Sequence, residues 1–476
     1  MSRFSSTTLS VTAVLTLGVH FLPAVDEVPS VEQRLQALDQ EIKILQRKAE
    51  LVAEEAAASD NAAKKAPKFT ANNKDGFSLS SSDGAYKLRF GGSAQIEGVY
   101  FLNDDAVPKN NTFFVRRVRP YFQGTVAKYF DYQLVLDYSP LSTTTVSLLD
   151  ASVTANIDPT FKLQAGRFKT PFGLEYLQAD PQTAFIERGF PTQLSPGRDA
   201  GAQALGEIGG GLVSYQIGIF NGPTDRADRD SDSSDDKEAI ARLYAAPFKE
   251  SNLVALAGLN VGIAVSYGQD APVRNAANTT ITASNLPTYQ SPGGTTFFSY
   301  AATAVSDGER LRFSPQLYYT WGSWDVLAEY VSSRQEVRTA NFATGAALTE
   351  RIGVTHTAWQ IESGYVLTGE DSGFRGISPD GGGVGASGWG AVQLVLRVSE
   401  FDIDNAAFSN GLASRTTSAE QALNCGVGVN WWLNRNVRIA LNYDRTEFVA
   451  GGGGTNANPI DKETEQIIRS RVQLIF

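Results

Sequence analysis

From Phe77 to the C-terminus, hydrophobic and polar side chains alternate with a period of two in several segments. In the first segment one parity carries Tyr86, Leu88, Phe90, Ala94 and Ile96, and the other carries Lys87, Arg89, Ser93, Gln95 and Glu97. Residues 149–157, 311–321, 423–431 and 437–443 show much the same pattern. Such alternation is typical of β-strands with one apolar and one polar face. We therefore predict an all-β domain over residues 77–476.

The connections between these strands alternate between short and long. Tight turns are predicted at 128–130, 158–159, 209, 249–251, 322–323 and 434–435. Long polar links are predicted at 102–112, 139–145, 169–199, 221–237, 269–308, 334–353, 404–418 and 450–462, and residues 369–387 are long where a turn is expected. The count is about sixteen antiparallel strands with turns on one side and loops on the other, which indicates a transmembrane β-barrel of the bacterial outer membrane.

The N-terminal segment has a different hydrophobic period. Spacings of four and three residues alternate through Val31, Leu35, Leu38, Ile42, Leu45, Ala49 and Val52. This seam of about three heptads predicts a short α-helical coiled coil, with an amphipathic helix on the protein's own surface as the alternative. Arg3, the apolar stretch 9–22 and a small residue at Ala24 predict a signal peptide. The expected organisation is a signal peptide over 1–24, a coiled-coil helix over 25–55, a linker over 56–76 and a barrel over 77–476.

The composition narrows the chemistry that a site can use. The chain has one Cys and two His, and its net charge is −10. A single Cys excludes an intrachain disulfide and a cysteine-built metal site. Because His20 lies in the predicted signal peptide, a catalytic triad would have to use His356. We expect no catalytic residue, no metal site, no cofactor, no nucleic-acid partner and no transmembrane helix. The acidic run 225–238 lacks the glycine and ligand spacing of an EF-hand, so we interpret it as a solvated loop.

Arginines fall on the parity that faces the lumen of the predicted barrel. Over residues 113–127 we assign Phe114, Val118, Phe122 and Val126 to the lipid face, and therefore Arg117, Arg119, Tyr121 and Gln123 to the lumen. An arginine that faces lipid at the bilayer midplane would cost about 2–4 kcal/mol. Arg116 falls on the lipid parity, so we expect it at the loop end of the strand or turned inward by a bulge. The same reasoning places in the lumen Asp150, Arg310, Arg312, Arg397, Arg438, Arg469 and Arg471.

Lumenal arginines support two interpretations. Rings of Arg or Lys select anions in pores, because the guanidinium group pairs with phosphate and carboxylate oxygens. The alternative is that the arginines pair with lumenal carboxylates such as Glu97, Asp137 and Glu329 and brace the wall. At this stage the two remain open for each arginine.

A set of motifs spread along the chain resembles one family of porins. In order, they are FVRRVRPYFQGTV, LLDASVTANIDPTFKLQAGRFKTPFGLE, AFIERGF, SPGRDAG, YQIGIFNG, YVLTGE and GVGVNWWLNRNVRIALNY. From residue 77 to 476 the chain resembles the phosphate-selective porins O and P. The resemblance implies a trimeric, sixteen-stranded outer-membrane channel. It further implies a long loop folded into each pore, an arginine ladder, and lysine-rich mouths that guide anions such as phosphate.

The resemblance assigns roles to particular residues. Arg116 and Arg117 match paired arginines, Asp150 a central acid, Arg188 an inward-loop arginine, and Arg242 a ladder arginine. Arg119 joins the predicted constriction through its inward parity, and the constriction loop carries Arg167, Lys169 and Arg198. Three positions depart from the family pattern. The family's arginine on the first strand is replaced by Ser93, its lysine in the inward loop is replaced near Pro181, and its turn lysine is replaced near Asp131.

These observations predict an outer-membrane porin, a passive channel that prefers anions, with phosphate selectivity left open by the three departures. The expected partners are inorganic phosphate or other small anions, outer-membrane lipid and two further copies of the chain. The alternatives are a general or other-solute porin and a structural barrel that tethers the envelope through its coiled coil. A barrel enzyme with a nucleophile beside His356 is a further alternative.

Overall fold

The computed structural model describes residues 30–72, 76–102, 109–138, 146–228 and 235–476. The chain divides into two units, Met1–Ala66 and Pro67–Phe476. In the first, helix α1 (Val31–Lys65) begins with a capping box in which Ser30 and Gln33 exchange hydrogen bonds of 3.0 and 3.3 Å. The helix extends through residues 56–65 of the expected linker, because this stretch is rich in Ala, the strongest helix former. No described helix is long and apolar enough to cross a membrane.

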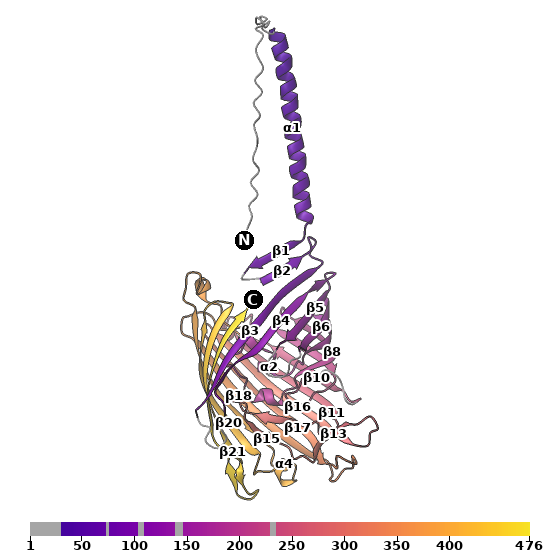
Figure 1. The fold of residues 1–476 in the computed structure, drawn as a ribbon, viewed down its shortest axis with the longest axis vertical. Coiled ribbons are helices and arrows are strands. Elements are labelled where there is room, and N and C mark those ends of the chain that lie inside the picture. The colour runs from indigo at the N-terminus through magenta and orange to yellow at the C-terminus, as the bar shows by residue number, and fades with distance from the viewer. Residues whose placement is uncertain (1–29, 73–75, 103–108, 139–145, 229–234) are drawn as a thin grey trace, which may run out of the picture. The chain divides into compact units, whose positions relative to one another are not determined.

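Sixteen antiparallel strands form a closed barrel within the described part of the second unit (Figure 1), as the sequence predicts. They are β3 (Lys87–Phe101), β4 (Thr112–Val126), β5 (Phe130–Asp137), β6 (Ser147–Asp158), β7 (Phe161–Lys169), β8 (Arg198–Ile208), β9 (Val213–Phe220), β10 (Glu238–Ala245), β11 (Leu259–Asp270), β16 (Ala304–Trp321), β17 (Trp324–Thr339), β18 (Ile352–Val366), β19 (Ala391–Asp402), β20 (Ala419–Trp432), β21 (Val437–Gly454) and β23 (Glu465–Ile475). The barrel closes because β23 pairs with β3 from Ile467↔Phe101 to Ile475↔Ser93.

The shorter elements are not part of the barrel wall. A hairpin of β1 (Lys68–Asn72) and β2 (Gly76–Ser80) occupies the rest of the expected linker, and β2 pairs with β3. The connections carry the strands β12 (Val273–Arg274), β13 (Ile281–Ala283), β14 (Thr288–Gln290), β15 (Thr296–Ser299) and β22 (Pro459–Asp461). They also carry the helical turns α2 (Leu174–Leu177), η1 (Asp180–Gln182), α3 (Pro191–Leu194), η2 (Val254–Leu256), η3 (Asp380–Gly382) and α4 (Asn405–Ser409).

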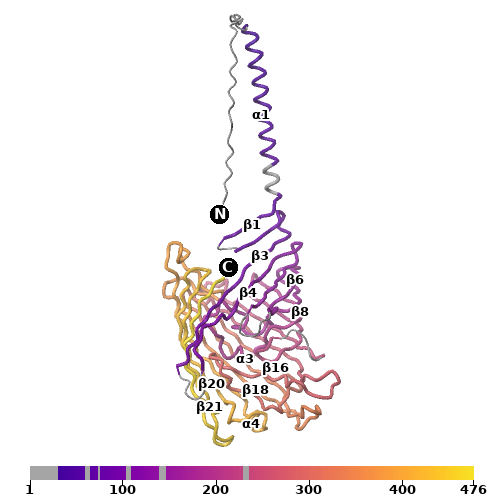
Figure 2. The backbone as a smooth tube through the Cα atoms, in the orientation of Figure 1, coloured from indigo at the N-terminus to yellow at the C-terminus, as the bar shows by residue number. Residues whose placement is uncertain are grey.

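Short and long connections alternate around the barrel, as predicted. Strands β16 and β17 are joined by Gly322 and Ser323 alone, whereas β7 and β8 are separated by residues 170–197. Among the described residues two links on the turn side are long. Residues 367–390 between β18 and β19 are long as expected, whereas residues 246–258 between β10 and β11 are longer than the tight turn predicted at 249–251. In Figure 2 most of the long loops gather at the barrel end opposite to Phe476. Since outer-membrane barrels have periplasmic turns and extracellular loops, Phe476 lies at the periplasmic end.

Glycines allow the C-terminal residue to close the barrel. Phe476 and Gly92 exchange two backbone hydrogen bonds of 3.0 Å, and the Phe476 ring lies 5.9 Å from that of Phe90. A β-carbon at Gly91 would lie 2.2 Å from the Tyr121 hydroxyl and 2.4 Å from the Phe476 carbonyl. Only glycine permits this approach of backbone to neighbour.

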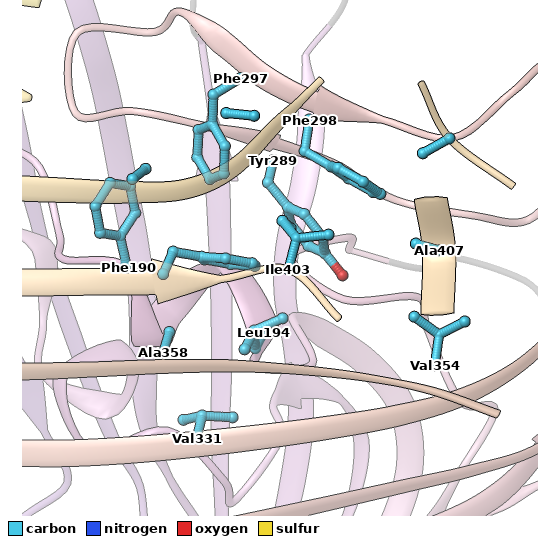
Figure 3. Packing of buried hydrophobic residues seen from close by; sticks show 14 of the residues in the cluster. Phe190, Leu194, Tyr289, Phe297, Phe298, Val331, Val354, Ala358, Ile403 and Ala407 are labelled. Carbon is cyan, nitrogen blue, oxygen red and sulfur yellow. The ribbon is translucent and has the colours of Figure 1, made fainter. Parts of the chain in front are cut away.

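The hydrophobic core lies inside the barrel. Phe190 and Leu194 from the link 170–197 pack with Tyr289, Phe297 and Phe298 from the link 271–303 and with side chains of β17 and β18 (Figure 3). The rings of Phe190 and Phe297 meet edge to face with centroids 5.6 Å apart, a favourable aromatic geometry. We name residues 170–197 the first inward loop and residues 271–303 the second inward loop. The sequence predicted the first and missed the second.

Candidate pore constriction

A β-bulge in β4 turns two consecutive arginines toward the lumen. Gln95 pairs with Arg117 and Ile96 pairs with Val115, so Arg116 is the extra residue between them. A bulge shifts the alternation of faces by one residue. The prediction that a bulge turns Arg116 inward is therefore confirmed.

The same bulge corrects the assignment of Phe114. Phe113 is 70% exposed and Val115 is 37% exposed on the outer face of the barrel, whereas Phe114 lines an interior cavity beside Arg116. From Val118 onward every second residue of β4 faces lipid. Before the bulge the order is reversed, because Arg116 is one extra residue in the strand.

Asp180 of the first inward loop collects three of the predicted constriction arginines. Its carboxylate pairs with Arg188 at 2.6 Å, with Arg117 at 3.8 Å and also with Arg119. Arg119 in addition donates a 2.9 Å hydrogen bond to Asp137. Burial alone would raise the pKa of the Asp180 carboxyl, but the surrounding arginines hold that pKa well below its usual range.

A second loop carboxylate, Glu187, pairs with the remaining arginine of the set. Glu187 lies 3.3 Å from Arg116 and 3.6 Å from Arg469 of β23. Burial would raise the pKa of the Glu187 carboxyl, but these two arginines lower it well below the ordinary value. Arg116, Arg117, Arg119 and Arg188 are thus brought together, and the loop supplies the two carboxylates between them.

Of the other residues assigned to the site, Lys169 reaches this group, because it shares the carbonyl of Gln178 with Arg188. Asp150 accepts a 2.9 Å hydrogen bond from Arg198. Arg167 donates hydrogen bonds to the carbonyls of Leu148 and Leu149. Lys169 donates hydrogen bonds of 2.6 and 2.8 Å to the carbonyls of Tyr176 and Gln178. Arg242 donates to Gln316 at 2.9 Å and stacks on the ring of Tyr244. Lys169 therefore holds the start of the first inward loop, whereas Arg167 and Arg198 contact the neighbouring strand β6.

Further lumenal arginines pair with buried carboxylates of the barrel wall. Arg397 pairs with Asp444 at 3.0 Å, and Arg310 pairs with Asp270 at 2.6 Å, with all four side chains buried. Arg469 and Arg471 both pair with Glu97. For Arg310 and Arg397 the structure favours the bracing interpretation, whereas Arg469 also lies 3.6 Å from Glu187 of the constriction. Glu329 differs from the expectation, since it accepts the backbone N–H groups of Leu174 and Glu175 at 2.6 and 3.2 Å.

The two ends of the acidic run 225–238 are buried, which corrects its interpretation as a solvated loop. Asp225 accepts hydrogen bonds from Arg312 at 2.6 Å and from the Tyr289 hydroxyl at 3.0 Å. Glu238 is fully buried and accepts a 3.0 Å hydrogen bond from Arg310. The lumenal arginines draw these carboxylates inward, because a buried charge needs a partner. Residues 229–234 lie outside the described part of the chain.

Side chains of the wall from β17 to β23 hold the backbone of the first inward loop. Asn442 accepts from the Ile186 N–H at 2.8 Å, Arg438 donates to the Thr183 carbonyl at 2.7 Å, and Asn430 donates to the Ala184 carbonyl at 2.9 Å. On its other side, Asp180 and Glu187 reach the arginines of β4. The loop therefore crosses the lumen and is fixed at both walls.

Two cavities lie at different levels of β4. The outer cavity, of about 310 Å³, is lined by Phe114 and Arg116 near the loop end of the strand. The inner cavity, of about 300 Å³, is lined by Gln123 and Thr125 near the turn end. Arg117 and Arg119 lie between these levels on the same strand. The outer cavity also includes Arg226 and residues 290–294 of the second inward loop, which no pattern in the sequence had singled out.

His356 has the surroundings of a structural residue. Its Nε2 lies 2.7 Å from the Tyr300 hydroxyl, and its Nδ1 accepts the backbone N–H of Asp404 at 3.1 Å. Both ring nitrogens are thereby engaged in holding loops in place. Among the described residues, no group of His, Cys, Asp and Glu is placed to hold a metal ion.

Comparisons with known proteins match this architecture. The family described as phosphate-selective porin O and P matches residues 87–476. Porin O of Pseudomonas aeruginosa is 22% identical over 418 residues, which cover 80% of this chain and 88% of that protein. The outer membrane channel DcaP of Acinetobacter baumannii is 9% identical with a TM-score of 0.50, covering 82% of this chain and 98% of its own. Outer-membrane expressed OmpT of Vibrio cholerae is 11% identical with a TM-score of 0.49, and the match covers 86% of this chain and 100% of the OmpT chain.

The family match extends over nearly the whole barrel, from the first residue of β3 to Phe476. It covers every arginine of β4 and the first inward loop. The chain belongs to the phosphate-selective porin O and P family and is an outer-membrane porin, a channel rather than an enzyme.

Proposed function

We propose that this porin prefers anions and that Arg116, Arg117, Arg119 and Arg188 form its constriction. The observation that carries the proposal is the excess of arginine around the first inward loop. With Arg469 and Arg471 this group contains six arginines. The carboxylates that pair with the six are Glu97, Asp137, Asp180 and Glu187. Arginines thus outnumber carboxylates by two in this group, and an excess of positive charge at a constriction favours anions.

Inorganic phosphate is one of the anions that we expect to pass. The three departures from the family pattern bear on how strongly it binds. Ser93 pairs in register with Arg119, and Asp131 accepts hydrogen bonds from Thr125 and Asn156 at the turn end of the lumen. The carbonyl of Pro181 accepts from Gln473 at 2.9 Å, and its neighbour Asp180 is the negative centre of the arginine group. We therefore propose weak binding of phosphate, with a preference for anions in general.

Single-channel recording in planar bilayers tests this proposal. The reversal potential in a KCl gradient should show anion preference, and Arg117→Gln and Arg188→Gln should each weaken the block of chloride current by phosphate. Arg445→Gln is the matched control, because Arg445 is half exposed in a pair with Glu447 away from the site. Cation preference would refute the anion channel. Unchanged phosphate block in both variants would refute the assignment of the constriction.

We further propose that the chain forms a homotrimer in outer-membrane lipid and that α1 assembles as a coiled coil with its copies. Val31, Leu35, Leu38, Ile42 and Leu45 on its heptad seam are each more than half exposed. In a parallel assembly Arg34 at a g position of one helix faces Asp39 at the next e position of another, a favourable pairing.

The coiled coil can be tested in the full-length protein. Leu38→Asp with Leu45→Asp should lower the thermal stability of the trimer in detergent, measured by cross-linking at increasing temperature. The control is Gln40→Asp, because Gln40 lies at an f position away from the seam. If the trimer is equally stable in the double variant but cells lose envelope integrity, α1 tethers the barrel and does not hold the trimer.

A further inference from the structure

The outer cavity has walls of opposite chemical character. One wall is apolar and consists of Val99, Phe101 and Phe114 from the loop ends of β3 and β4. The facing side chains include Arg188 and Arg226 together with the carboxylate residue Glu187, and residues 290–294 complete the rim. Arg116 lies at the junction, two residues from Phe114 on the same strand. A small hydrated anion uses only the cationic part of such a cavity.

The size of the outer cavity also exceeds what a bare inorganic anion needs. Its volume of about 310 Å³ falls at the lower end of the roughly 300–1,000 Å³ typical of sites for small organic molecules. Since a water molecule takes about 30 Å³ in the liquid, this volume corresponds to on the order of ten waters. An apolar wall buried beside water is costly, and an apolar body that displaces this water is favoured.

Polar groups on the rim are held in fixed positions. Arg226 donates a 2.6 Å hydrogen bond to the Gln290 side chain, which ties the loop after β9 to the second inward loop. The N–H of Gly293 donates to Glu465 at 3.0 Å and fixes the rim to β23. Arg188 is likewise held by Asp180 and by the carbonyl of Gln178 at 2.8 Å. The arginines therefore face the cavity from a preorganised frame, which lowers the cost of binding.

We propose that the outer cavity binds organic anions that carry a carboxylate or phosphate group on an aromatic body, and that these anions are preferred over inorganic phosphate. The charged group lies against Arg116, Arg188 and Arg226, and the ring lies against Phe101 and Phe114. This inference rests on the proposed anion channel and adds a class of solute to it. The inference gives the aromatic wall a binding role that a channel selective only for charge would not require.

Block of single-channel chloride current by phenyl phosphate, methyl phosphate and inorganic phosphate tests the proposal in the full-length channel. We expect phenyl phosphate to bind about tenfold more tightly than methyl phosphate, which corresponds to about 1.4 kcal/mol. Phe114→Ala should remove most of this difference between the two esters. Phe113→Ala is the matched control, since it deletes a neighbouring ring that is 70% exposed on the outer face.

The outcomes separate this inference from the proposed function. Equal block by phenyl phosphate and methyl phosphate in an anion-preferring channel would overturn the aromatic site and leave the anion channel standing. Cation preference in KCl would overturn both. A Phe114→Ala channel that still distinguishes the two esters tenfold would also overturn the assignment of the cavity, provided that Phe113→Ala behaves as the parent.

Discussion

The two walls of the lumen differ in what surrounds their inward-facing side chains. On the wall from β16 to β21, Arg312, Ser399 and Asn424 are fully buried, because both inward loops and the aromatic cluster cover them. On the wall from β3 to β7, Gln123 and Thr154 line the open inner cavity. On both walls lumenal and outward side chains alternate along the strands, apart from bulges such as the one at Arg116. The loops therefore decide which lumenal charges brace the barrel and which can meet a solute.

The largest expected effect is the loss of a buried ion pair on the covered wall. Asp444→Asn leaves Arg397 without its carboxylate partner, and both side chains are less than a tenth exposed. Breaking a buried pair from one side costs about 3–5 kcal/mol, since the remaining charge is buried without compensation. We expect a decrease of this size in the free energy of unfolding of the barrel, measured by urea titration in lipid vesicles.

A second pair on the same strand provides the control. Glu447→Gln removes the carboxylate that lies 2.6 Å from Arg445, but these side chains are about half exposed. Exposed pairs contribute about 0–1 kcal/mol. Equal losses in the two variants would contradict the distinction between ion pairs buried in the lumen and exposed pairs on the outer face of the same strand.

An intermediate effect is expected at the boundary between the walls, where Asp180 neutralises the arginines of β4. Asp180→Asn removes one negative charge from a group that includes Arg117, Arg119 and Arg188. At about 5 Å and an effective dielectric constant of 20–80, one charge contributes roughly 1–3 kcal/mol. We expect phosphate to block chloride current with about tenfold higher affinity, measured by single-channel recording.

Asp131→Asn carries the same change in net charge and serves as the control for this prediction. Asp131 lines the inner cavity at the turn end of the lumen, away from the arginine group. Its substitution should leave phosphate block close to that of the parent. An equal increase in both variants would show that total lumenal charge, and not the partner of the β4 arginines, sets the affinity.

Local pattern was sufficient to predict the barrel because every strand crosses the same boundary between lipid and lumen. The period of two and the alternation of turns and loops both depend on residues close in sequence. The inward direction of Arg116 could be predicted too, because an arginine in lipid is costly. Phe114 was misassigned because the position of a bulge depends on the partner strand β3.

The partners of the site residues could not be predicted in this way. Asp150 pairs with Arg198, and Asp180 collects Arg117, Arg119 and Arg188, through contacts that depend on how a long loop folds. The second inward loop carries no periodic signal, since Tyr289, Phe297 and Phe298 gain their burial from strands far away in the sequence. A pattern along the chain identifies the inward faces but not the loops that cover them.

The smallest expected effect is the response of the constriction to acid. The pKa values of Asp180 and Glu187 are held below the ordinary carboxyl value of about 4 by the arginines around them. A carboxyl whose pKa is lowered by folding stabilises the folded loop above its ordinary pKa, and this contribution is lost only as pH falls through the lowered value. We therefore expect single-channel conductance in KCl to stay constant from pH 7 to about 4 and to change only in stronger acid.

The Asp180→Asn channel separates the constriction from other acidic groups in this experiment. The amide side chain of this variant cannot titrate, so the response of its conductance below about pH 4 should be reduced relative to the parent, whereas Asp131→Asn should leave the response unchanged. A conductance change in the parent centred between about pH 4 and 5, absent from Asp180→Asn, would mean that Asp180 titrates like a solvated carboxyl. The arginines of β4 would then be free to meet anions, and the boundary between bracing and solute-facing charges would have to be moved to include them.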